Sequence, residues 1–132
     1  MDKKYVAYIG CYTFHGSSKG IAIMDVDVAN GRFIKRKEIR VNNSSYLTVS
    51  HDHQYLYSIV DEGVASFKIL PDGNLKHLNT ATIKGMRGCF LTTDSKNRFL
   101  VTAGHHDGKM TVLRLKENGG VGHITAEGYD RG

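Results

Sequence analysis

The sequence predicts an all-β protein, a partial β-propeller built from consecutive four-stranded antiparallel sheets. Helical periodicity is nearly absent, and short stretches rich in Val, Ile, Tyr, Phe and Thr alternate with turns of Gly, Asn, Asp and Ser. A motif also recurs, because LTVSHDHQYLYS from Leu47 resembles LTTDSKNRFLVT from Leu91, 44 residues later. Four antiparallel strands with a period of this length are typical of one propeller blade.

Two further alignments extend the repeat over the rest of the chain. VASFKILPDGNL from Val64 aligns with MTVLRLKENGGV from Met110, 46 residues later, so the second copy has two extra residues in a loop. IAIMDVDVANGRF from Ile21 aligns with the Val64 stretch, and YVAYIG from Tyr5 aligns with YLYSIV from Tyr55. The chain therefore contains two complete copies of the repeat and an earlier, partial copy.

Each complete copy predicts four strands in chain order. The predicted strands are 5–11, 21–27 and 33–40 in the partial copy, 46–50, 55–60, 64–70 and 75–82 in the second copy, and 89–93, 99–104, 109–115 and 121–126 in the third. The connection between the last two strands of each copy contains Asn30-Gly31, Pro71-Asp72-Gly73 or Asn118-Gly119-Gly120. These are strong signals for hairpin turns.

The first copy lacks the strand that begins each of the others, the innermost strand of a blade. The predicted blade units are about 1–41, 42–85 and 86–132, with no separate second domain. About two and three-quarter blades are too few to close a ring, and a blade needs neighbours to cover its faces. We therefore expect either a piece of a longer protein or self-association through the open blade edges.

Composition limits the classes of function. No apolar run approaches the roughly 18 residues that a membrane span requires, and the N-terminus lacks the features of a signal peptide. Two cysteines among 132 residues indicate free thiols in a reducing cytoplasm. The formal net charge of +5 is scattered along the chain, so we expect no nucleic-acid partner. A mild positive field would still attract an anionic small molecule.

Several stretches resemble one known family, the lactonase-type seven-bladed propellers that include 6-phosphogluconolactonases. The stretch GCYTFHGSSKGIAIMDVD is similar to the Gly-Thr-Tyr-Thr motif of that family and the Lys-Gly-Ile strand that follows it. Likewise NNSSYLTVSHDHQYLY resembles its Asn-Pro-Ser-Phe-Leu segment, VDEGVASFKI its Asn-Glu-Gly stretch, and GMRGCFLTTD its Gly-Pro-Cys-His-Leu stretch. The resemblance covers the chain, but only the first two to three blades of such a protein.

The resemblance implies a cytoplasmic enzyme that hydrolyses a sugar lactone, such as 6-phosphogluconolactone, without a cofactor. The partner would be a small anionic sugar lactone. We expect the chain to be inactive alone, because other blades would supply much of the binding surface. Phe90 stands where the family has a histidine, and His105-His106 replace its Asn-Tyr. These departures leave open an alternative, a non-catalytic binding or scaffolding propeller.

The pair His51 and His53 first suggests a metal site, but the repeat places both residues in a turn, aligned with Ser95 and Asn97. Zinc needs three or four convergent ligands, so we expect no metal here. The two cysteines, Cys11 and Cys89, are expected to be small buried residues and not nucleophiles.

Strand direction sorts the remaining polar residues, because alternate connections of an up-and-down blade lie on the same face of the disc. Ligand sites on such scaffolds are assembled from loops on one face. Lactone hydrolysis needs a general base and a group that stabilises the oxyanion. The predicted catalytic residues are Glu62, His105 and His106, and the predicted substrate-binding residues are Arg87, His15 and Asn43. Arg87 would bind a phosphate or carboxylate through bidentate hydrogen bonds.

Overall fold

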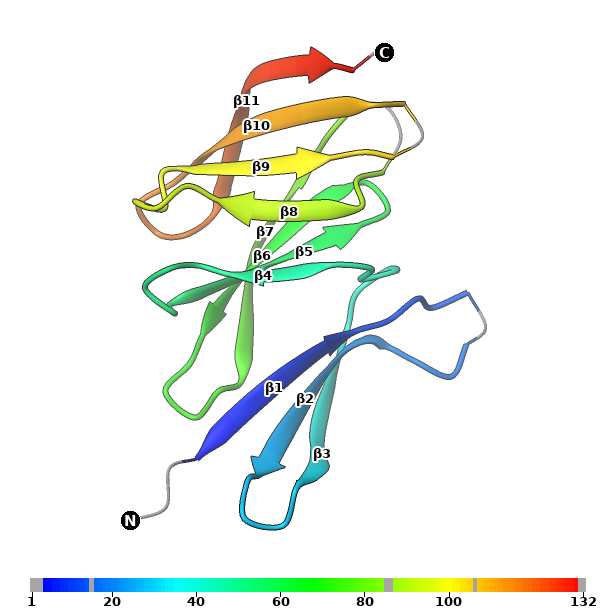
Figure 1. Ribbon diagram of the computed structural model, residues 1–132, viewed down its shortest axis with the longest axis vertical. Helices are drawn as coiled ribbons and strands as arrows, with labels where there is room; N and C mark the ends of the chain where they lie inside the picture. Colours follow the sequence, from blue (N-terminus) through cyan, green and yellow to red (C-terminus); the bar gives the residue numbers. More distant parts are fainter. Residues whose placement is uncertain (1–3, 15, 85–86, 106, 131–132) are drawn as a thin grey trace.

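The computed structural model describes residues 4–14, 16–84, 87–105 and 107–130, and the described part of the chain is all β. Its strands form three antiparallel sheets, each made of strands consecutive in the chain (Figure 1). The strands are β1 (Tyr5–Gly10), β2 (Gly20–Asp27), β3 (Arg32–Arg40), β4 (Leu47–Val49), β5 (Tyr55–Val60), β6 (Gly63–Ile69), β7 (Leu75–Thr82), β8 (Phe90–Thr93), β9 (Phe99–Ala103), β10 (Lys109–Leu115) and β11 (Val121–Tyr129).

The sheet topology confirms the predicted partial propeller. The first sheet has the order β1-β2-β3, the second β4-β5-β6-β7 and the third β8-β9-β10-β11. Within the described ranges, the second and third sheets have four strands and the first has three, as the missing strand before Tyr5 predicts. Three predicted strands have the observed bounds, namely β5, β7 and β10. The last strand is longer than predicted, because β11 continues past Ala126 and pairs as far as Tyr129 with Lys109.

The turn between the last two strands repeats in all three sheets. Gly31, Gly73 and Gly119 have φ angles of 64°, 89° and 88°, respectively. Glycine adopts this left-handed conformation without a steric penalty, which explains why each hairpin signal in the sequence ends in glycine. Each of these strand pairs also contains a register shift. The shift lies after Ile23 in β2, after Ser66 in β6 and after Val112 in β10. The repeat in sequence is thus a repeat in backbone geometry.

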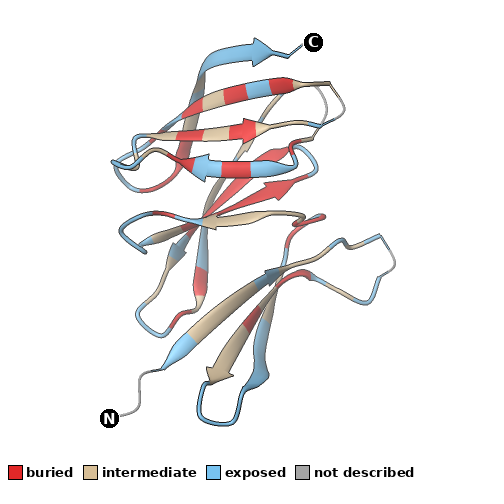
Figure 2. Cartoon of the chain, viewed as in Figure 1, coloured by how far each residue is buried: buried red, intermediate tan, exposed pale blue. Residues whose placement is uncertain are grey.

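The hydrophobic core lies between the sheets, in two clusters. One cluster joins the first and second sheets and contains Ile21, Ile23, Leu56 and Phe67. The other joins the second and third sheets and contains Tyr57, Ile59 and other residues of β6 and β8–β11. Leu56 and Tyr57 are neighbours in β5 but belong to different clusters, because successive side chains of a strand point to opposite faces. The central strands β5 and β6 of the second sheet are therefore buried on both faces, whereas much of the first sheet remains exposed (Figure 2).

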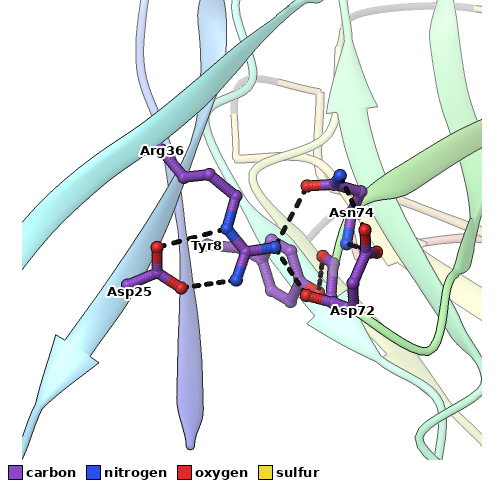
Figure 3. Close-up of polar contacts among 6 residues, drawn as sticks. Tyr8, Asp25, Arg36, Asp72 and Asn74 are labelled. Atoms are coloured by element: carbon purple, nitrogen blue, oxygen red, sulfur yellow. Dashed lines mark hydrogen bonds and ion pairs between the residues drawn. The ribbon is translucent and has the colours of Figure 1, made fainter.

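Polar contacts also join each sheet to the next hairpin. Tyr8 Oη donates a hydrogen bond of 2.5 Å to the Gly73 carbonyl, and Tyr57 Oη donates one of 2.9 Å to the Gly119 carbonyl. Arg36 lies at the register shift between β2 and β3, and its guanidinium bridges Asp25 to the Asp72 carbonyl and Asn74 Oδ1 in the β6–β7 hairpin (Figure 3). This ion pair lowers the pKa of the Asp25 carboxyl. The hairpins of the second and third sheets are thus fixed by the preceding sheet.

Replacement of Tyr57 by phenylalanine is expected to lower the free energy of unfolding by about 1–2 kcal/mol. The change removes the hydrogen bond to the buried Gly119 carbonyl and leaves that acceptor unsatisfied. Equilibrium urea denaturation measures the loss. The matched control is Tyr55→Phe, since the Tyr55 ring also contacts Gly119 but its hydroxyl makes no hydrogen bond within the described residues. Equal losses in the two variants would contradict the proposed role of the Tyr57 hydroxyl.

The same variant should change the alkaline stability of the protein. Burial raises the pKa of Tyr57 above its ordinary value of 10.0, so the hydroxyl stays protonated in the folded state after it ionises in the unfolded state. The stabilisation that the protonated Tyr57 hydroxyl gives to the folded state is complete below about pH 10, and it is lost as the pH rises towards the pKa of Tyr57 in the folded state. A weaker alkaline loss is therefore expected in Tyr57→Phe when stability is measured between pH 8 and 11.

The connections between strands lie on two opposite rims of the stacked sheets. The connections β1–β2, β3–β4, β5–β6, β7–β8 and β9–β10 lie on the right in Figure 1, and we call this side the Arg87 face. The hairpins and turns β2–β3, β4–β5, β6–β7, β8–β9 and β10–β11 lie on the other side, the Gly73 face. Loops that are distant in the sequence therefore meet on one rim.

Candidate functional site

A hydrogen-bonded cluster joins three connections on the Arg87 face, and Asn43 lies at its centre. Asn43 precedes β4, is 4% exposed and has a left-handed φ of 53°, a conformation that asparagine tolerates better than most residues. Its side-chain oxygen accepts hydrogen bonds from Thr13 N at 2.6 Å and Thr13 Oγ1 at 3.0 Å. Its side-chain nitrogen donates to the Asp61 carboxylate at 2.9 and 3.1 Å. Both ends of the amide are therefore occupied.

Arg87 adds a fourth connection, the one between β7 and β8. One terminal nitrogen donates to the Asn43 carbonyl and to Ser45 Oγ, the latter at 3.1 Å, and the other lies 3.5 Å from Asp61 Oδ1. The guanidinium carbon also lies 5.5 Å from the centroid of the Tyr12 ring, within range of a cation–π contact. We call Thr13, Asn43, Asp61 and Arg87 the Asn43 cluster. The guanidinium holds the loops of successive sheets in one arrangement.

The Asp61 carboxylate is the solvent-facing group of this cluster. Its side chain is 49% exposed, whereas that of Arg87 is 23% exposed. Asn43 and Arg87 fix the direction of the carboxylate, and its exposed side remains available to water or to a ligand. An oriented carboxylate beside a cation can accept a proton or a hydrogen bond from a ligand. The sequence pattern predicts Glu62 and not Asp61 as a site residue. The signal that could have identified Asp61 is the pair of adjacent acidic residues, Asp61-Glu62, in a connection on the predicted ligand face.

Glu62 occupies a different environment from Asp61. Its side chain lines a groove with residues of β3, β6 and β7, and its carbonyl accepts a hydrogen bond of 3.0 Å from Ile83 N. The two acidic residues therefore have different neighbours, although they are adjacent in the same turn. The acidic side chain that meets Arg87 is thus Asp61, and a catalytic role for Glu62 stays a prediction.

The predicted histidines are placed only in part. His105 is exposed in the β9–β10 connection, on the Arg87 face, next to Gly104. A Cβ at Gly104 would lie 3.7 Å from the Arg87 carbonyl, so this connection packs against the backbone of Arg87. His15 and His106 lie outside the described residues. The structure therefore brings Asn43 and Arg87 into contact and places His105 in a connection beside them, while its catalytic role stays a prediction.

His51 and His53 lie in the turn between β4 and β5, on the Gly73 face, as the repeat predicts. His53 has a φ of 60°, and His51 N donates a hydrogen bond of 3.0 Å to Asn97 Oδ1 in the aligned turn of the third sheet. Within the described residues, no three His, Cys, Asp or Glu side chains are grouped so that they could hold a metal ion. The same residues include no helix with the length and hydrophobicity of a membrane span. Cys11 is partly buried but Cys89 is exposed, so the expectation that both are buried is wrong for Cys89.

Comparison with known proteins gives one consistent family. Residues 6–128 match the family described as lactonase, 7-bladed β-propeller. A 6-phosphogluconolactonase from Bacillus subtilis is 31% identical over 135 aligned positions, which cover 98% of this chain and 38% of the relative. A 6-phosphogluconolactonase from Formosa agariphila is 26% identical, with 89% of this chain and 35% of the relative covered. The chain thus spans less than two-fifths of the length of these relatives.

Solved structures agree with the fold. A Bacteroides fragilis crystal structure, provisionally assigned as a 6-phosphogluconolactonase, superposes with a TM-score of 0.88 and 28% identity, and covers 99% of this chain and 38% of its own. The Pseudomonas aeruginosa periplasmic gluconolactonase superposes with a TM-score of 0.86 at 21% identity, and covers 96% of this chain and 39% of its own. The latter likeness supports the fold alone.

Proposed function

Because the chain belongs to the lactonase family of seven-bladed β-propellers, we propose that it forms part of an enzyme that hydrolyses a sugar lactone such as 6-phosphogluconolactone. The observation that carries this proposal is the match along residues 6–128, together with the similarity to a 6-phosphogluconolactonase over 98% of the chain. The Asn43 cluster is the part of the described structure best suited to contribute to a ligand site, because it joins loops of successive blades on one rim.

Hydrolysis of a lactone requires a water molecule to attack the ester carbonyl and lose a proton to a base. The ring oxygen then leaves and takes up a proton, which gives a hydroxy acid. We propose Asp61 or His105 as a group that accepts the proton or holds a sugar hydroxyl, since both side chains are exposed on the Arg87 face. The net charge of +5 would help to attract a phosphorylated substrate.

In this proposal Arg87 and Asn43 act mainly as positioning residues. The terminal nitrogens of Arg87 and both ends of the Asn43 amide already have protein partners. A ligand phosphate could bind Arg87 through bidentate hydrogen bonds only if it displaced Asp61 or Ser45. The interactions present instead fix the direction of the Asp61 carboxylate.

The test is an assay of lactone hydrolysis by the natural full-length protein that contains these residues. We expect saturable hydrolysis of 6-phosphogluconolactone above the spontaneous rate, followed through proton release with a pH indicator. The unphosphorylated gluconolactone should react with lower kcat/KM, because it lacks the phosphate charge that the net positive charge of these 132 residues attracts. Absence of any rate above the spontaneous reaction with both lactones would contradict the proposal.

We further propose that the 132-residue chain alone turns over little lactone. Large apolar side chains remain exposed on its first and third sheets, including Phe33 at 62% and Met110 at 50%. These surfaces fit further blades or a second copy of the chain, so self-association through open edges is the related expectation. A purified chain that hydrolyses the lactone as a strict monomer, by mass measurement in solution, would contradict both statements.

One observation favours the alternative of a non-catalytic binding or scaffolding propeller. Phe90, which stands where the resembling family has a histidine, is a β8 residue that is 44% exposed. The centroid of its ring lies 5.2 Å from the centroid of the Tyr46 ring, so this position makes an aromatic contact and carries no titratable group. The same lactone assay separates the two functions, because a scaffold would bind without turnover.

A further inference from the structure

A groove separate from the Asn43 cluster lies between the first two sheets, where the end of β3 faces β6 and β7. Its volume is about 400 Å³. Buried apolar side chains form its floor, namely Val41, Val60, Ala65 and Phe67, which are 2–7% exposed. Its border is polar and comprises Arg40, Asn42, Glu62, His77 and Thr80. An apolar floor with a few convergent polar groups is the usual composition of a small-molecule site.

The polar side chains on the border are largely uncommitted. Arg40, Asn42 and Glu62 make no side-chain hydrogen bond or ion pair with any other residue in the described ranges, although the structure contains six ion pairs elsewhere in those ranges. His77 is held in place, since its Nε2 lies 3.0 Å from Thr80 Oγ1 and its ring centroid lies 5.3 Å from that of Phe67. The groove therefore combines a fixed aromatic wall with an arginine that forms no ion pair within the described residues, although Glu62 lines the same groove.

We propose that this groove binds a small carboxylic acid with an apolar body, such as an aromatic or branched-chain acid. Arg40 would hold the carboxylate through paired hydrogen bonds, with the Asn42 amide as a second donor. The apolar body would cover the floor and remove it from water. The volume is near the lower end of the usual range for ligand sites, which fits a single ring or a short branched chain.

This ligand class differs from that of the lactonase proposal, and the inference does not depend on that proposal. A sugar phosphate is polar over its whole surface and would leave the buried apolar floor without a matching group. The acidic residues also separate the two sites, because Asp61 belongs to the Asn43 cluster and Glu62 to the groove. Both walls of the groove come from the first and second sheets, which are already neighbours.

Phenylacetate is a suitable probe, and methyl NMR of the protein detects its binding. We expect saturable shifts of the methyl signals of Val41, Val60 and Ala65, with nuclear Overhauser contacts to the phenyl protons. Arg40→Gln should weaken the affinity at least tenfold, because it removes the charged donor. Arg32→Gln is the matched control, since Arg32 begins the same strand and its side chain is 67% exposed. It should leave the affinity unchanged.

Two further measurements make the role of charge testable. Phenylacetamide, which is neutral and of similar shape, should bind at least tenfold more weakly than phenylacetate. Glu62→Gln should tighten phenylacetate binding a few-fold, since it removes a like charge from the border of the groove. The proposal is overturned if the floor methyl signals do not respond, if Arg40→Gln binds as well as the unmodified protein, or if the amide binds equally well.

Discussion

Replacement of Arg87 by alanine is expected to lower kcat/KM for 6-phosphogluconolactone about 100-fold in the full-length protein. The guanidinium contacts Asp61, the Asn43 carbonyl and Ser45, so its loss leaves the Asp61 carboxylate oriented by Asn43 alone and loosens the loop before β4. When a catalytic group moves out of its productive position, the reaction rate falls by a factor of this size, even though the group itself remains. Initial-rate measurements over a range of lactone concentrations give the value.

The controls separate positioning from unfolding. Arg114→Ala removes an exposed arginine, on β10 and away from the Asn43 cluster, and should leave kcat/KM unchanged. Arg87→Lys keeps the charge but not the planar guanidinium, so an intermediate loss is expected. The stability of Arg87→Ala should fall by only about 1–2 kcal/mol, as for the loss of partly exposed polar contacts. An unchanged kcat/KM in Arg87→Ala would contradict the role given to the cluster.

Replacement of Gly63 by alanine is expected to lower the free energy of unfolding by about 3 kcal/mol. A Cβ at this position would lie 2.1 Å from the Ala81 carbonyl oxygen and 2.9 Å from Ile83 N. Both are backbone atoms of the neighbouring strand region, and Ile83 N is bonded to the Glu62 carbonyl, so the clash cannot be relieved by a side-chain rotation. Equilibrium urea denaturation gives the change in stability.

Gly128→Ala is the matched control for this substitution. Gly128 also lies in a strand, but a Cβ there would meet nothing within 4 Å, and its φ is not in the left-handed region. Its stability should therefore change by less than about 0.5 kcal/mol. If Gly63→Ala were as mild as Gly128→Ala, the close pairing of the β5–β6 turn with the end of β7 would be wrong.

The strands could be predicted because their signals are local and repeated. β-branched and aromatic residues define β5, the aligned repeat and its turns define β7 and β10, and the hairpins follow from Gly31, Gly73 and Gly119. The length of β11 could not be predicted, because Gly128 and Tyr129 have no pattern of their own and are ordered by pairing with β10. Tertiary pairing decides such strand ends.

The sequence could predict on which rim the candidate site lies, but not which side chains are in contact there. Strand direction placed Asn43, Arg87 and His105 on one face, and the structure has these residues in connections on that face. Whether Asp61 or Glu62 turns towards Arg87 depends on the backbone of a two-residue turn, which the repeat leaves undetermined. The hydrogen bonds of Asn43 to Thr13 and Asp61 join residues 30 and 18 positions apart, so no local signal marks them.

We propose that the lactone and its hydrolysis product bind on the Arg87 face and not on the Gly73 face. The most direct test is a titration of the full-length protein with the hydrolysis product, 6-phosphogluconate, followed through backbone amide NMR signals. We predict saturable shifts at Thr13, Asp61 and Gly104, with the hairpin residues Asp72 and Gly119 unaffected. Shifts confined to those hairpins would contradict the account.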